Sequence, residues 1–241
     1  MKKIAILLLL VGVVTAIVMP FPSAQTRLKS YFGGDALAYA GKTVIATTNT
    51  GELELFSISS TGVVDRFAAM RSYDARFAKP VDFKDVVLNV EDGKLYAYAV
   101  DGKSIIKYDI SDLNSMRQVA SAQDNSWDYF GGVDKIHNYI ATIGSNGIKL
   151  WTANMQVFDQ YKIVTPGNYV FNSSDAGNSR YVFTVGEDKI RMFDRESRST
   201  FREIPLSFTW AGGFYNRALY NDTADNAVYV VDDKAVQKIN F

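Results

Sequence analysis

Paired carboxylates are the residues of this chain best suited to catalysis. Three such pairs occur, at Glu91-Asp92, Glu187-Asp188 and Asp232-Asp233, and two neighbouring carboxyl groups are sufficient to hydrolyse a glycosidic bond. All three pairs lie in short polar stretches between apolar segments, which is where turn residues are found. We therefore assign no catalytic residue and predict that the protein is not an enzyme. A carboxylate-dependent glycoside hydrolase is the less favoured alternative.

Nucleophilic and metal chemistry lack the residue types that they need. The chain has one histidine, His137, and no cysteine, so a Ser-His-Asp mechanism would have to use His137. No nucleophile motif accompanies that histidine, and a zinc site needs several His or Cys ligands. We predict no metal and no cofactor, although one acidic cluster leaves a weak calcium site open. Its members are Asp222, Asp225, Asp232 and Asp233.

Five segments share one plan, in which a β-rich run is followed by a tight polar turn and an alternating strand. The runs are residues 43–48, 95–100, 139–143, 181–185 and 227–231, and the strands after them are residues 52–56, 104–109, 148–151, 189–193 and 235–239. Turns such as Asp101-Gly102 suit hairpins because both positions need positive φ. The turns recur about every 40–50 residues, the length of a four-stranded propeller blade. The sequence therefore predicts an all-β fold, a β-propeller of five four-stranded blades.

Further strand candidates suggest how the ring closes. They are residues 26–30, 63–67, 116–120, 157–161 and 200–204. Three copies of aromatic-X-Gly-Gly follow such outer strands, at residues 31–34, 129–132 and 210–213. The first outer strand precedes the first unit, whereas the fifth unit has none after it. We predict that residues 26–30 pair with residues 235–240, so that the N-terminal strand closes the ring and leaves no long unpaired sheet edge.

The third strand of several repeats resembles the repeats of known propellers. Gly147-Ile-Lys-Leu-Trp151 and Lys189-Ile-Arg-Met-Phe-Asp194 resemble the last inner strand of WD40 repeats. Residues 104–112, continuing to residues 116–119, are similar to the LVIVD-type repeats of exported prokaryotic propellers. The resemblance implies an interaction platform, although a fold alone does not give a function.

Aromatic and polar side chains form the predicted ligand-binding site. In a propeller, the outer-to-inner connections share a face with the turns of the five units. Aromatic rings beside amide and carboxylate groups suit sugars or extended peptides. The alternative is that the rings pack between neighbouring blades. The aromatic residues are Tyr31, Trp127, Tyr129, Tyr169 and Trp210, and the polar ones are Asn49, Asp101, Asn146, Asp188 and Asp233.

The N-terminal residues are typical of an export signal. Lys2 and Lys3 precede an uncharged run over residues 4–19, and Ser23-Ala24-Gln25 offers a cleavage site. The run is slightly long for a signal peptide and slightly short for a membrane span. We predict that residues 1–24 are a signal peptide or an N-terminal membrane anchor and that residues 25–241 form one propeller domain. The protein would then be secreted, periplasmic or held at the cell surface.

Charge argues against two classes of partner. Lys plus Arg and Asp plus Glu each number 26, so the formal net charge is zero. A neutral chain gives no electrostatic reason to expect nucleic acid or an anionic membrane as partner, and membrane contact would come only through an uncleaved N-terminal segment. We predict a non-catalytic propeller that binds a protein at the cell surface or in the periplasm. The alternative is a carbohydrate-binding, lectin-like propeller with a glycan partner.

Overall fold

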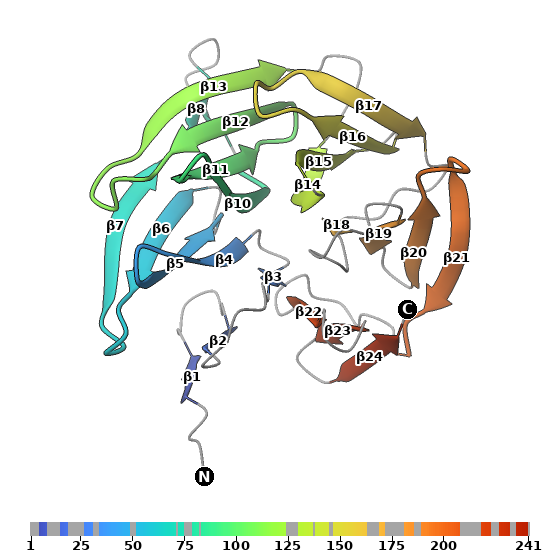
Figure 1. Ribbon diagram of the computed structural model, residues 1–241, viewed down its shortest axis with the longest axis horizontal. Helices are drawn as coiled ribbons and strands as arrows, with labels where there is room; N and C mark the ends of the chain where they lie inside the picture. Colours follow the sequence, from blue (N-terminus) through green and yellow to red (C-terminus); the bar gives the residue numbers. More distant parts are fainter. Residues whose placement is uncertain are drawn as a thin grey trace.

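A computed structural model gives the fold of the chain. The structure describes residues 5–8, 15–18, 27–30, 34–48, 52–70, 72–74, 79–81, 83–123, 130–136, 138–144, 147–162, 169–171, 181–185, 189–207, 218–222, 227–231 and 235–240. These residues form five four-stranded antiparallel sheets, arranged in a ring (Figure 1). The predicted all-β propeller is therefore confirmed.

We number the sheets as blades 1 to 5 and give each from its inner to its outer strand. Blade 1 contains β4 (Gly34–Tyr39), β5 (Lys42–Thr47), β6 (Leu53–Ile58) and β7 (Val64–Met70). Blade 2 contains β10 (Asp85–Glu91), β11 (Lys94–Val100), β12 (Ser104–Asp109) and β13 (Arg117–Gln123). Blade 3 contains β14 (Phe130–Ile136), β15 (Tyr139–Gly144), β16 (Gly147–Trp151) and β17 (Val157–Lys162).

The remaining strands complete the other two blades and two small sheets. Blade 4 contains β18 (Tyr169–Phe171), β19 (Tyr181–Val185), β20 (Lys189–Asp194) and β21 (Ser199–Pro205). Blade 5 contains β3 (Arg27–Ser30), β22 (Ala218–Asp222), β23 (Ala227–Val231) and β24 (Val236–Asn240). The pairs β1 (Ala5–Leu8) with β2 (Thr15–Val18), and β8 (Ser72–Asp74) with β9 (Lys79–Val81), form two-stranded sheets. None of the described residues belongs to a helix long and apolar enough to cross a membrane.

Tight hairpins join the two inner strands of a blade. Between β10 and β11 the turn residues Asp92 and Gly93 have φ values of 49° and 77°, and between β4 and β5 Ala40 and Gly41 have values of 48° and 74°. Positive φ at both positions matches the right-handed twist of the flanking strands. The register of blade 2 is thereby fixed from Glu91 paired with Lys94 to Asp85 paired with Val100.

An irregularity recurs between the third and fourth strands of blades 1 to 4. The register shifts at Leu55/Phe56, Lys107/Tyr108, Leu150/Trp151 and Met192/Phe193. An aromatic residue stands at each of these bulges. A bulge increases the local twist of its strand, and the shared position of the aromatic residue shows that the four blades are structural repeats.

The core of blades 1 to 4 lies between neighbouring blades, and blades 2 and 3 bury both of their faces in this way. Val44 and Leu55 of blade 1 pack with Leu88 and Tyr108 of blade 2. The opposite face of blade 2 packs against blade 3 through a second cluster that contains Tyr98 and Trp151. A third cluster joins blade 3 to blade 4 through Ile143, Tyr161 and Phe193. Alternate residues of one strand therefore serve two different cores.

The N-terminal strand joins the last blade, but the predicted pairing partner was wrong. The four residues of β3 pair with β22, from Ser30 opposite Ala218 to Arg27 opposite Asn221, whereas residues 235–240 contain β24 at the outer edge of that sheet. In Figure 1, β3 lies near the centre of the ring beside β4. Chain length explains this, since only residues 31–33 separate β3 from β4. The four peptide links from Ser30 to Gly34 reach at most about 14 Å. Pairing with β24 would place β3 at the outer edge of the sheet, three strands further from the centre, and three interstrand spacings alone are about 14 Å.

Candidate functional site

Most of the predicted binding face lies outside the described residues. That holds for Tyr31, Trp127, Tyr129, Trp210, Asn49, Asn146, Asp188 and Asp233, as it does for His137. Tyr169 begins β18, where it pairs with Val185 of β19. Asp101 precedes β12. The structure therefore does not test whether the aromatic residues gather on one face, and that prediction stands as made.

Asp101 has a local structural role. Its Oδ1 accepts hydrogen bonds from the backbone N–H groups of Lys103 at 3.1 Å and Ser104 at 2.7 Å, while its own N–H donates to the Ser104 carbonyl. An aspartate that binds the backbone two residues ahead stabilises a turn. This carboxylate is thus already engaged in shaping the β11–β12 connection.

Two buried aspartates near the centre of the ring join neighbouring blades. Asp85 Oδ2 accepts the backbone N–H of Val133 in blade 3 at 2.8 Å, and its Oδ1 accepts that of Val86. Asp35 does the same one blade earlier, accepting the N–H of Leu88 at 2.7 Å and that of Ala36 at 2.9 Å. Each carboxylate therefore links the inner strand of its own blade to the inner strand of the next.

The geometry of an inner strand explains why it needs such a partner. Ile136 pairs with Tyr139 across a two-residue turn, and a pair that flanks such a turn is hydrogen-bonded. Because the direction of the N–H groups alternates along a strand, that of Val133 points away from β15, toward the open inner edge. A buried N–H without an acceptor is costly, and Asp85 supplies the acceptor.

The sequence carries a signal for Asp35 and for the equivalent Asp134, although not for Asp85, which has no Gly-Gly before it. Asp35 directly follows the Gly-Gly of residues 31–34, and Asp134 follows the equivalent glycines at 129–132 after one residue. Asp134 is also buried, and its Oδ1 accepts the Lys135 N–H at 2.7 Å. An acid placed next to a repeated Gly-Gly marks the start of an inner strand.

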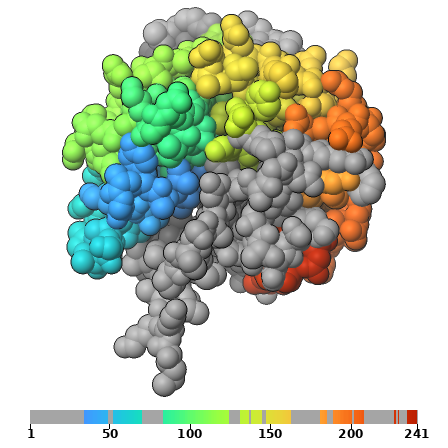
Figure 2. Space-filling model, viewed as in Figure 1, coloured from blue at the N-terminus to red at the C-terminus, as the bar shows by residue number. Residues whose placement is uncertain are grey.

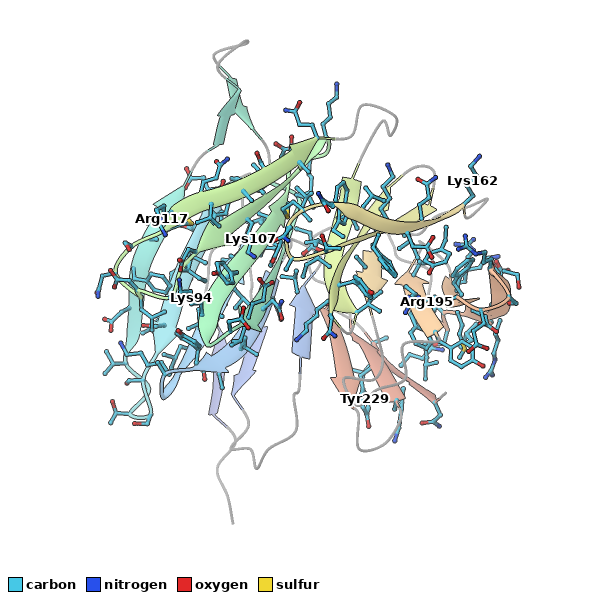
Figure 3. All side chains as sticks on the ribbon, turned by 45° about the horizontal axis from the view of Figure 1, so that its top comes forward. Lys94, Lys107, Arg117, Lys162, Arg195 and Tyr229 are labelled. Carbon is cyan, nitrogen blue, oxygen red and sulfur yellow. The ribbon has the colours of Figure 1, made fainter. Side chains whose placement is uncertain are left out.

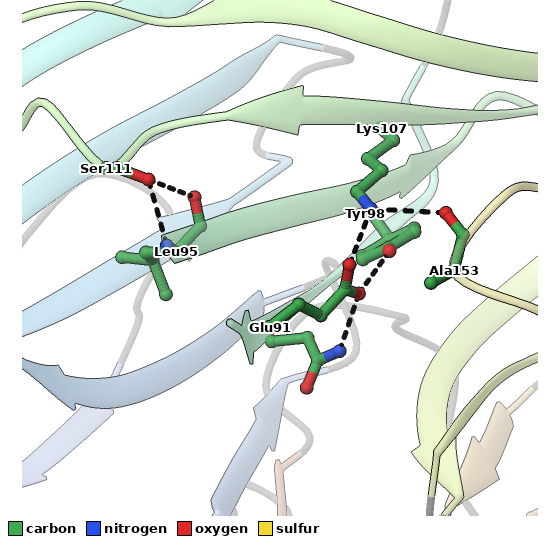
Figure 4. A network of polar contacts seen from close by, with 7 residues as sticks. Glu91, Leu95, Tyr98, Lys107, Ser111 and Ala153 are labelled. Carbon is green, nitrogen blue, oxygen red and sulfur yellow. Dashed lines mark hydrogen bonds and ion pairs between the residues drawn. The ribbon is translucent and has the colours of Figure 1, made fainter. Parts of the chain in front are cut away.

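A polar network lies at the boundary between blades 2 and 3 (Figure 4). Glu91 Oε2 pairs with Lys107 Nζ at 2.6 Å, and its Oε1 accepts hydrogen bonds from Tyr98 Oη and, at 2.8 Å, from Asn89 Nδ2. Lys107 also donates to the Ala153 carbonyl of blade 3 at 3.1 Å. The predicted carboxylate pair Glu91-Asp92 is thus split between an ion pair and a turn.

Burial sets the character of this network, which we call the blade 2–3 network. The Lys107 and Glu91 side chains are only 10% and 18% exposed, and the Lys107 ammonium lies 4.0 Å from the centre of the Tyr96 ring. Burial, and then the hydrogen bond to Glu91, raise the pKa of Tyr98 far above its ordinary value. Tyr98 therefore remains a neutral hydrogen-bond donor, and the network binds the two blades together.

A second polar group lies at the boundary between blades 3 and 4, near the outer strands. Arg198 Nη2 contacts both carboxylate oxygens of Asp159, at 3.2 and 3.1 Å. Tyr161 Oη donates to Asp159 Oδ2 at 2.9 Å, and Arg195 Nε donates to Tyr161 Oη at 3.2 Å. Both arginines belong to the turn between β20 and β21, which therefore extends over β17. Figure 3 labels Lys107 in blade 2 and Arg195 in blade 4, on either side of blade 3.

This second group is open to solvent. The Arg198 side chain is 60% exposed and that of Asp159 is 26% exposed. Partial burial acts to raise the pKa of Asp159, but the hydrogen bond from Tyr161, the Gln160 N–H and the charge of Arg198 together lower it below its ordinary value. Asp159 is therefore ionised and holds the guanidinium of Arg198 in place.

Exposed aromatic surface adjoins these charges. Phe158 is 53% exposed, and its ring stacks on that of Tyr139 with centroids 4.2 Å apart and an interplanar angle of 17°. Val157 beside it is also exposed. Figure 2 shows the surfaces of blade 3, in yellow, and blade 4, in orange, meeting at the rim. We call this surface the blade 3–4 rim; it consists of Tyr139, Val157, Phe158, Asp159, Tyr161, Arg195 and Arg198.

Metal ligation finds no support in the described part of the chain. No three His, Cys, Asp or Glu side chains there are placed to hold an ion. Of the acidic cluster that the sequence offers for calcium, Asp222 ends β22. The other three, Asp225, Asp232 and Asp233, lie outside the described residues.

Comparison with known proteins supports the fold and assigns no activity to this chain. Neither a protein-family model nor a curated protein matches the sequence. A protein of unknown function from Bacteroides caccae aligns with a TM-score of 0.54 and 12% identity, over 94% of this chain and 82% of its own. A candidate 6-phosphogluconolactonase from Bacteroides uniformis ATCC 8492 aligns with a TM-score of 0.51 and 12% identity, over 87% of this chain and 75% of its own.

A third solved structure is longer than this chain. It is a chain of the mitotic checkpoint complex, aligned with a TM-score of 0.48 and 12% identity over 85% of this chain. This chain spans 62% of the length of that protein. At such identities, structural likeness concerns the fold alone.

Proposed function

We propose that this chain is an exported, non-catalytic β-propeller that binds a protein partner. The observation that carries the proposal is the engagement of the aspartates near the centre of the ring. Both oxygens of Asp85 and both of Asp35 accept backbone N–H groups. A general acid or base must exchange a proton with a substrate, and a nucleophilic carboxylate needs an oxygen that can reach the substrate, whereas these hydrogen bonds orient both oxygens of each aspartate toward the protein.

The composition of the blade 3–4 rim supports a protein as the ligand. Exposed aromatic and arginine side chains such as Phe158 and Arg198 are enriched in protein–protein interfaces. In the blade 2–3 network, by contrast, comparable groups are buried in the scaffold. The rim is therefore the described surface best suited to a macromolecular partner.

Export rests on the N-terminal segment. Lys2 and Lys3 before the uncharged residues 4–19 form the pattern of a secretory leader. Fractionation of cells producing the full chain with a C-terminal tag tests this part. We expect the tag in the medium, in the periplasm or on the membrane with an externally accessible domain. Full-length protein in the cytosol would contradict export.

Substituting Asp85 tests the non-catalytic assignment. In D85N the amide must turn its NH₂ group toward Val86 or Val133, so one backbone N–H loses its acceptor, at a cost of about 1–3 kcal/mol. We expect a lower melting temperature, with D35N as the matched variant one blade earlier. Hydrolysis of 6-phosphogluconolactone or of a glycoside by the wild type, abolished in D85N at unchanged stability, would overturn the assignment.

A further inference from the structure

We infer that the blade 3–4 rim binds an acidic segment of a partner protein, with a carboxylate on Arg198 and an apolar side chain against Phe158. This inference rests on the proposed function and adds the place of binding and the chemistry of the ligand. It is carried by the orientation of one arginine, by the hydrogen-bond donors that it leaves unused, and by the exposed ring next to it.

Arg198 is held in place before any partner binds. Its φ of 56° lies in the left-handed region, where a residue with a Cβ is uncommon. Asp159 contacts its Nη2, and its guanidinium lies 5.3 Å from the centre of the Tyr161 ring. A side chain fixed in this way loses little entropy when it binds a ligand, which favours affinity.

The nitrogens of Arg198 that make no hydrogen bond in the described structure can only donate one, so the ligand must offer a hydrogen-bond acceptor. A guanidinium carries five N–H donors, yet within the described structure only Nη2 makes a hydrogen bond. Nε and Nη1 remain on a side chain that is 60% exposed. The carboxylate of the rim, Asp159, already accepts from Arg198, Tyr161 and Gln160. A partner carboxylate suits these donors because it can accept two parallel N–H groups.

The apolar half of the site lies next to the charged half. Phe158 precedes Asp159 in β17 at a register shift, which interrupts the alternation of side-chain faces. Its ring stacks on that of Tyr139, which packs against the cluster that contains Tyr161. Half of the Phe158 side chain remains in contact with water, and covering it would add a hydrophobic contribution to binding. An acidic residue close to an apolar one in an extended partner segment would match both halves.

Blade 2 supplies a matched control. Arg117 in β13 is also exposed and also contacts an aspartate, Asp109, but at 3.5 Å and through a single pair of atoms. R117A therefore removes the same charge from another blade. Like Arg198, Arg117 lies outside the packed core.

The experiment is selection of a phage-displayed random peptide library on the full chain. We expect enrichment of peptides that carry Asp or Glu next to Leu, Phe or Trp. Synthetic versions of the enriched peptides should bind R198A and F158A at least about tenfold more weakly, the loss expected for a charge-assisted hydrogen bond in the first variant and for the contact with an aromatic ring in the second. Binding to R117A should remain unchanged, as should the melting temperatures of all three variants within a few degrees. Replacing the acid of the peptide by its amide should cost as much as R198A.

Two other outcomes separate this inference from the proposed function. Enriched peptides that bind R198A and F158A as tightly as the wild type would overturn the assignment of the rim and leave the protein-binding function standing. A library that yields no specific peptide, with a glycan array that yields specific binding, would contradict both.

Discussion

The two boundaries of blade 3 contain the same kinds of group and use them differently. Toward blade 2, Lys107 and Glu91 form an ion pair with side chains 10% and 18% exposed. Toward blade 4, Arg198 and Asp159 form one with side chains 60% and 26% exposed. Tyrosines support both pairs. The difference lies in burial, which makes the first pair a structural tie between blades and leaves the second with donors free to meet a ligand.

The buried and the exposed ion pair are expected to contribute different amounts to the free energy of unfolding. Breaking a buried pair leaves one charge without compensation in a medium of low dielectric constant, which typically costs about 3–5 kcal/mol. An exposed pair is screened by water and salt, and its contribution is about 0–1 kcal/mol. The comparison therefore predicts that the blade 2–3 network controls stability and that the blade 3–4 rim can be altered with the fold intact.

The largest effect is expected from K107M. Methionine keeps the length and the apolar stem of lysine but leaves the Glu91 carboxylate buried without its cation. Because both side chains retain some access to water, we expect a loss of about 2–4 kcal/mol in the free energy of unfolding. Urea denaturation followed by tryptophan fluorescence measures it.

The double variant and the rim variant complete this test. E91Q/K107M removes both charges and should recover much of the stability lost in K107M. R198M should lie within about 1 kcal/mol of the wild type. Equal losses in K107M and R198M would remove the distinction between the two boundaries.

An intermediate effect is expected from a matched pair of threonines at the same boundaries. Thr142 in β15 and Thr184 in β19 are both buried. The residue paired with each threonine across the strands is a lysine or an arginine, and an aromatic residue follows that residue two positions later. In blade 3 the aromatic residue is Trp151, whose Nε1–H donates to Thr142 Oγ1 at 2.8 Å. In blade 4 it is phenylalanine, and Thr184 Oγ1 has no hydrogen-bond partner in the described structure.

Valine at each position should therefore have opposite consequences. T142V removes the hydroxyl that accepts the hydrogen bond from Trp151 Nε1–H, and we expect a loss of about 1–3 kcal/mol. T184V removes a buried hydroxyl that makes no hydrogen bond, so the variant should be as stable as the wild type or more stable. Thermal unfolding of the two variants measures both changes. A loss in T184V as large as that in T142V would mean that Thr184 has an equivalent partner.

The smallest effect concerns the acid response of the blade 3–4 rim. The pKa of Asp159 is lowered in the folded state, so the stability it contributes is present above the unfolded value of about 3.9 and is lost as pH falls through the folded value. D159N should therefore be slightly less stable than the wild type at neutral pH, by less than about 1 kcal/mol, and equally stable in strong acid. Denaturation at several pH values tests the sign. A deficit that grows toward acid pH would contradict it.

Local sequence patterns predicted the strands and turns well because their causes are local. The run at residues 95–100 and the strand at 104–109 became β11 and β12, since period-two alternation and positive φ at turn positions act over a few residues. The partner of β3 depends on how far residues 31–33 can reach in the folded ring. A count of strands does not include that distance.

The candidate site was less accessible to sequence reasoning. Phe158 and Arg198 are 40 positions apart, and nothing in the local pattern around either residue indicates that they share a surface. Their proximity arises because the β20–β21 turn extends across the outer strand of the preceding blade. Asp35 and Asp134 could have been found, since both stand beside a repeated Gly-Gly, but an acid at that place predicts a link between blades only once the ring is known.

Amide chemical-shift mapping of the full chain with a selected acidic peptide tests the central claim most directly. The account predicts that shifts concentrate at Val157 to Tyr161 and Arg195 to Arg198 as peptide is added, while Asn89, Glu91 and Lys107 remain unchanged. The peptide with amides in place of its acids should produce no shifts at the same concentrations. Shifts centred on the blade 2–3 network, or on Asp35 and Asp85 near the centre of the ring, would contradict the division between a structural boundary and a binding boundary.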